Sequence, residues 1–172
     1  VPNDGDYVVQ VLDHLKNGGE NYFYRVELTP VTPSLSLSTN EFVQYVQPVV
    51  AVPKGNQVGL VLSAARVDFG GPLALRGVDL PDGVTLEPAG VMPANASVMP
   101  VLFHATPEAA LSGKLSEVIA ALQDEKQPNL KVEGKVQQNI ALVRGQNQIP
   151  FWVEYTNRIP VVVTDESPFT LT

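Results

Sequence analysis

Short runs of alternating apolar and polar residues recur along this sequence. In Tyr22–Thr29 the even-numbered residues are apolar, and Arg25, Glu27 and Thr29 would occupy the opposite face. Successive side chains of a strand point to opposite faces, so this period of two indicates a half-buried strand. Further strand-like runs are Ser34–Ser38, Val58–Ser63, Phe151–Thr156 and Val161–Thr164.

Turn-forming residues separate these runs. Proline fixes φ and glycine or asparagine tolerates positive φ, which tight turns require. Such residues stand at 53–56, 70–72, 81–83 and 145–147, and the 15 prolines and 13 glycines of the chain are more than usual. Strands spaced by turns predict an all-β fold, either a sandwich or a barrel.

Residues 107–126 allow two interpretations. Their larger apolar residues recur at helical spacing, and residues 116–122 have good helix propensity. Ser112 and Gly113 interrupt the start of such a helix, and the flanking residues suit a strand that follows a turn. We favour the strand and keep the helix as the alternative.

A boundary is expected at Pro30–Pro33, because two prolines three residues apart stiffen the chain and exclude a central strand. We therefore assign residues 1–31 to one domain and 34–172 to another. Thirty residues with two strands cannot bury a core alone. The first segment is expected to pack on the second domain, or to complete a module whose earlier strands are missing.

Composition excludes several function classes. The net charge is −7 and the basic residues are not clustered, which disfavours nucleic acid and anionic lipid as partners. The chain has no cysteine, which excludes disulfides and thiolate metal sites. It has no initiator methionine, signal peptide or apolar run of about 18 residues. We expect a piece or mature product of a longer protein, without membrane insertion.

The first segment resembles the C-terminal half of bacterial pre-peptidase C-terminal domains, which are small β-sandwiches appended to secreted proteins. The residues that carry this resemblance are Asp4–Tyr7, Val9–Val11, Asp13, Gly18–Gly19 and Tyr24–Val26. The resemblance implies that residues 1–31 form the C-terminal strands of such a sandwich, whose first half is not present in this chain.

Residues 34–172 resemble the immunoglobulin-like domains of large multi-module surface proteins of planctomycete-type bacteria. The resemblance rests on Arg66–Leu73, Leu80–Val84 and Phe103–Ala109. It implies an immunoglobulin-like antiparallel β-sandwich, preceded by the strands of a second sandwich. It also implies a location outside the cell, on the cell surface or in the periplasm, and it brings no known active site.

The ionisable residues offer little catalytic chemistry. Only His14 and His104 are present, and neither lies near a nucleophile motif, so we expect a solvated turn histidine and a strand histidine and no enzymatic activity. Calcium is the only cofactor that the acidic residues suggest, because it accepts six to eight oxygen ligands in flexible geometry. Its candidate ligands are Asp4, Asp6, Asp13 and Glu20, with Asn17 between them. Solvated turn carboxylates remain the simpler interpretation.

Carbohydrate binding is the strongest functional alternative. Exposed aromatic rings beside amides and carboxylates form sugar platforms on β-sandwiches. Trp152 and Tyr45, the latter near Gln44 and Gln47, are the candidate stacking residues. A single tryptophan in a sandwich is more often found in the core or an interface.

The sequence thus predicts a non-catalytic structural or interaction module of a larger secreted or surface protein. Its expected partners are neighbouring domains of the same polypeptide, other surface proteins or a polysaccharide. The alternative is a carbohydrate-binding module appended to a secreted enzyme.

Overall fold

The computed structural model describes residues 5–39, 45, 48–87 and 91–171. The chain divides into two units, Val1–Val31 and Thr32–Thr172. In the described part of the first unit every side chain is exposed and no residue belongs to a strand. The strand predicted for Tyr22–Thr29 is therefore wrong for this structure. A strand needs a neighbour for its backbone hydrogen bonds, and residues 5–31 form only two short turns.

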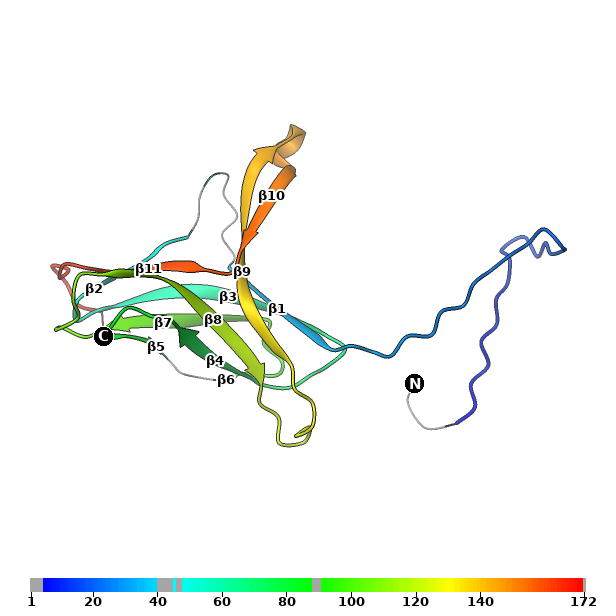
Figure 1. Ribbon diagram of the computed structural model, residues 1–172, viewed down its shortest axis with the longest axis horizontal. Helices are drawn as coiled ribbons and strands as arrows, with labels where there is room; N and C mark the ends of the chain where they lie inside the picture. Colours follow the sequence, from blue (N-terminus) through cyan, green and yellow to red (C-terminus); the bar gives the residue numbers. More distant parts are fainter. Residues whose placement is uncertain (1–4, 40–44, 46–47, 88–90, 172) are drawn as a thin grey trace. The chain divides into compact units, whose positions relative to one another are not determined.

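The described residues of the second unit form strands joined by short turns, as the sequence predicts (Figure 1). The strands are β1 Ser34–Thr39, β2 Val50–Pro53, β3 Gln57–Val67, β4 Leu73–Val78, β5 Val84–Glu87, β6 Val91–Met92, β7 Val98–Ala105, β8 Gly113–Leu122, β9 Glu133–Arg144, β10 Pro150–Thr156 and β11 Ile159–Thr164. A 3-10 turn, Gln146–Gln148, joins β9 to β10. The favoured interpretation of residues 107–126 is confirmed, because β8 spans Gly113–Leu122 within that segment.

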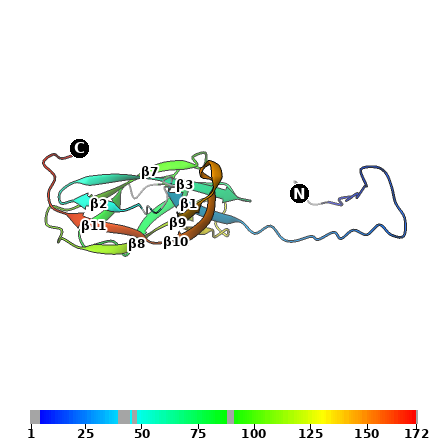
Figure 2. The same ribbon diagram turned by 90° about the horizontal axis from the view of Figure 1, so that it is seen from above.

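The strands pair in the order β2-β11-β8-β9-β1-β3-β7-β5, with β4 on β8, β6 on β4 and β10 on β9. This sheet curls over itself, so that β3 and β7 lie opposite β8 and β11 (Figure 2). Most pairs are antiparallel, but β1 with β9 and β2 with β11 are parallel. The fold is all-β and sandwich-like, as predicted from the alternation.

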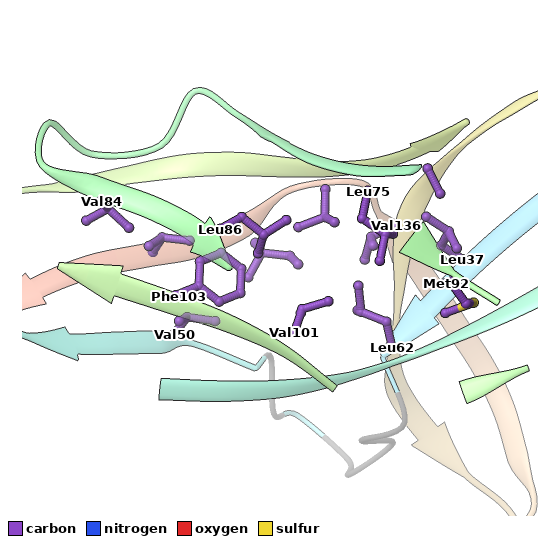
Figure 3. Packing of buried hydrophobic residues seen from close by; sticks show 14 of the residues in the cluster. Leu37, Val50, Leu62, Leu75, Val84, Leu86, Met92, Val101, Phe103 and Val136 are labelled. Carbon is purple, nitrogen blue, oxygen red and sulfur yellow. The ribbon is translucent and has the colours of Figure 1, made fainter. Parts of the chain in front are cut away.

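The core lies between the facing strands. On β7 the side chains of Val101, Phe103 and Ala105 are buried, while the residues between them are not. Leu62 of β3 and Leu75 of β4 point into the same interior (Figure 3). The alternation thus places one apolar face of each strand inside, where burial of apolar area stabilises the fold.

A buried asparagine holds the C-terminal segment by two hydrogen bonds. Asn56, at the turn between β2 and β3, is only 4% exposed. Its Nδ2 donates to the carbonyl of Phe169 at 2.8 Å, and its Oδ1 accepts the backbone N–H of Leu171 at 3.0 Å.

The described part of the chain contains no helix long and apolar enough to cross a membrane.

Candidate functional site

A two-stranded arm stands away from the layers of the sandwich (Figure 1). We define the arm as residues 140–156, which comprise the distal part of β9, the 3-10 turn and β10. The first half of β9 pairs with β8 and β1, whereas the distal half pairs with β10 from Gln138↔Thr156 to Arg144↔Pro150. The arm exists because β9 is twelve residues long and continues beyond the residues that pair with β8 and β1.

The tip of the arm is tied down locally. The backbone N–H of Gly145 donates to the carbonyl of Ile149 at 2.9 Å, and Nη1 of Arg144 donates to the carbonyl of Gln148 at 2.8 Å. Asn147 and Gln148 adopt left-handed backbone conformations with φ of 57° and 61°. Asparagine tolerates this region better than most residues, which suits the tight reversal.

The arm exposes its aromatic side chains. Phe151 is 83% exposed, Trp152 54% and Tyr155 61%, and Ile149 and Val143 are also exposed. The alternation in Phe151–Thr156 predicts a strand correctly, but it predicts a buried face wrongly, since no side chain of β10 is buried. The register against β9 shifts on both sides of Trp152, so β10 is irregular at that point.

Trp152 is oriented by a carboxylate. Its indole Nε1 donates to Oε1 of Glu154 at 2.8 Å. Residues two apart on a strand share a face, so the pair holds the ring in one orientation at the surface. Glu154 was not among the residues predicted for the site, although its spacing from Trp152 was a usable signal. Of the two locations expected for a lone tryptophan, core or interface, the core is wrong for Trp152, because β10 leaves the sandwich and the side chain is exposed.

Tyr45 lies beside the same stretch of β9. Its backbone N–H donates to the carbonyl of Ala141 at 3.0 Å, and its side chain is 73% exposed. Trp152 pairs with Val143, two residues further along β9. The structure therefore places both predicted stacking residues at the distal half of β9. At the base of the arm an open groove of about 390 Å³ is lined by Lys135, Val136, Gln137, Tyr155, Thr156 and Asn157.

The calcium candidates do not converge among the residues that the structure describes. Asp4 lies outside the described residues, and Asp6 and Glu20 are exposed. Oδ2 of Asp13 accepts the backbone N–H groups of Leu15 and Asn17, both at 3.0 Å, and so caps the local turn. Within the described ranges no three acidic or histidine side chains gather as metal ligands. Calcium binding stays a prediction.

A charged cluster covers the outer face of β8, and sequence reasoning missed it. The carboxylate of Glu117 is 7% exposed, and it lies 2.8 Å from Nζ of Lys135 and 3.2 Å from Nη2 of Arg158. Arg158 also donates to Asp79 at 2.9 Å, and this hydrogen bond raises the pKa of Arg158 above its ordinary value. The cluster ties together β8, β9 and two loops. Every charge has a partner, so its role is structural.

The two histidines lie as predicted. His14 is exposed in the turn between Asp13 and Lys16, and His104 is partly buried on β7, where it pairs with Gln57 and Thr85.

The sequence matches no protein-family model and no curated protein. The arm, with its oriented tryptophan, is the candidate functional site.

Proposed function

We propose that this chain is a non-catalytic structural and interaction module of a larger secreted or surface-anchored bacterial protein. One observation carries the proposal: β10, the second strand of the arm, exposes three aromatic side chains and has no buried residue. Large exposed apolar patches on soluble proteins mark contact surfaces, because leaving such area in water is unfavourable. The sandwich supplies the rigid body, and the arm supplies the contact.

The partners follow from the proposed location. The resemblance to tandem surface modules favours neighbouring domains of the same polypeptide and other surface proteins as partners. The net charge of −7 favours protein contacts over nucleic acid, and the low charge of β10, with Glu154 alone, suits an apolar contact.

Carbohydrate binding is the second candidate, and the pair formed by Trp152 and Glu154 favours it. An exposed ring held by a carboxylate resembles a sugar platform, with Tyr45 beside the same stretch of β9. In this alternative the chain would be appended to a secreted enzyme and would bind its polysaccharide substrate.

Depletion assays separate the two functions. The chain is mixed with cellulose, chitin, xylan or peptidoglycan, and the protein left in solution and the sugar released are both measured. The proposed function predicts that the native chain and the Trp152→Ala variant stay in solution equally and release no sugar. Saturable retention that is lost in Trp152→Ala but kept in Leu111→Ser would overturn the proposal in favour of carbohydrate binding. Leu111 is a suitable control because it is 57% exposed and lies outside the arm.

A further inference from the structure

The outer edge of β10 is open to a further strand. β10 pairs with β9 and with no other strand among the described residues. Its outward backbone groups can therefore accept another extended segment, as open sheet edges do. Natural edges are commonly blocked by lysine, proline or a bulge. Here Pro150 and the register shifts around Trp152 make one end of β10 irregular, while Val153–Thr156 pairs regularly with β9 and carries no lysine.

The sequence of β10 is self-complementary around Val153. If two copies of β10 lie antiparallel with Val153 opposite Val153, and the partner strand draws residues 150–152 into regular pairing, Phe151 of each copy faces Tyr155 of the other. The same register places the indole of Trp152 opposite the carboxylate of Glu154. Aromatic pairs directly opposite each other stabilise antiparallel strands, as do pairs that combine a donor with an acceptor. Equal patches that meet around a two-fold axis give a closed dimer.

The exposed area matches what a weak dimer needs. Phe151, Trp152 and Tyr155 together leave the equivalent of about two whole aromatic side chains in water, roughly 300–500 Å² at the usual burial for each ring. Two β10 edges that pair side by side would bury only part of this area on each copy, because Trp152 lies on the face opposite Phe151 and Tyr155. The interface then falls below the ~1,200 Å² of standard specific interfaces, in the range of weak, transient contacts.

We propose that the arm binds a second copy of this chain, through antiparallel pairing of the two β10 edges around Val153. The inference rests on the proposed function, in which the arm is the contact surface, and it names the partner. The module would then join two parent polypeptides side by side. The small interface predicts a reversible dimer, with a dissociation constant in the micromolar range.

Cysteine cross-linking tests the register, because the natural chain has no cysteine. Opposed Cα atoms in antiparallel strands are about 4.5–5.5 Å apart, within the range for a disulfide. Val153→Cys should therefore form covalent dimers under mild oxidation. Thr156→Cys should not, since the two sulfurs would lie about 20 Å apart along the strands.

A second pair of variants tests the same register in case Val153→Cys disturbs the fold. Phe151 and Tyr155 are both exposed, so replacing either with cysteine should leave the fold intact. Phe151→Cys and Tyr155→Cys should cross-link when the two proteins are mixed, and neither should do so alone. Equal cross-linking of all variants, or none in either set, would overturn the register.

Sedimentation velocity over a wide concentration range tests the dimer itself. We expect a monomer–dimer equilibrium whose dissociation constant rises at least about tenfold in Phe151→Ser/Tyr155→Ser and stays unchanged in Leu111→Ser. A monomer at every concentration, or growth beyond dimers, would overturn the inference. Either result leaves the proposed function standing, because that function is tested by the polysaccharide assays.

Discussion

The contact between Asn56 and the C-terminal segment gives the sharpest stability prediction. The buried amide bridges two backbone groups that are more than 110 residues away in the sequence, and its Oδ1 also accepts the N–H of Gln57 at 2.9 Å. Asn56→Ala removes all three side-chain hydrogen bonds at a site that is 4% exposed. The backbone bonds of Asn56 to Pro53 and Ala105 remain, so the turn itself should persist.

The magnitude follows from the hydrogen bonds. A net contribution of roughly 0.5–1.5 kcal/mol each predicts that Asn56→Ala lowers the free energy of unfolding by about 2–4 kcal/mol. For a unit of this size that corresponds to a fall in Tm of roughly 6–12 °C. Deleting residues 168–172 leaves the amide accessible to water, and the expected loss is smaller, about 1–2 kcal/mol. Gln57→Ala loses one long bond of 3.4 Å to Leu171 and serves as the matched control.

A double-mutant cycle measured by urea unfolding checks this reasoning. If Asn56 stabilises the fold partly by holding the tail, the deletion should cost little once Asn56 is alanine. The expected coupling energy is about 1–2 kcal/mol. Fully additive losses would refute the clamp, and an unchanged Tm in the deletion variant would show that the tail contributes nothing to this fold.

Three further predictions concern side chains outside the clamp. The amide nitrogen and oxygen of Gln138 are buried without a hydrogen-bond partner in the described part of the chain. Gln138→Met should therefore raise the free energy of unfolding by about 1–2 kcal/mol, and a lower free energy of unfolding in urea would contradict this. Hydrogen bonds from the Gln127 side chain and the Lys126 backbone lower the pKa of Asp124 in the folded chain. The ionised carboxylate therefore stabilises the fold above the unfolded pKa of about 3.9, and this contribution is lost as the pH falls through the lower folded pKa. Thermal melts from pH 7 to pH 2 should therefore show a shallower acid loss in Asp124→Asn than in the native chain, and equal slopes would count against the prediction. Glu117→Gln should destabilise the fold by about 1–3 kcal/mol, because the carboxylate of Glu117 is buried between Lys135 and Arg158. An unchanged Tm would show that these two basic side chains return to water at no cost in stability.

Local patterns predicted the strands of the sandwich well. The alternation in Ser34–Ser38 and Val58–Ser63 lies within β1 and β3, and the β-branched run Val161–Thr164 lies within β11. These patterns succeed because side-chain period and burial of one face are coupled in a paired strand. The same reasoning failed for Tyr22–Thr29, where the pattern is present but the described structure offers no strand to pair with.

Contacts between distant residues could not be predicted. Nothing local distinguishes Asn56 from other turn asparagines, yet it holds a segment at the far end of the chain. Glu117 sits in an ordinary strand sequence, and its basic partners come from β9 and from the loop before β11. The site was predicted in part: Trp152 and Tyr45 were identified by residue type, whereas their shared position on β9 depends on the pairing of strands.

The arm explains why the burial prediction failed at β10 while the strand prediction held. Alternation specifies that a strand has one apolar face, but it does not specify what covers that face. In β7 the opposing layer covers Val101 and Phe103, whereas β9 carries β10 beyond the reach of that layer. A chain that keeps Phe151, Val153 and Tyr155 on a strand outside its own core has the surface expected of a strand that is completed by another polypeptide. The uncovered apolar side chains of β10 are thus the reason for proposing that the arm is a contact surface.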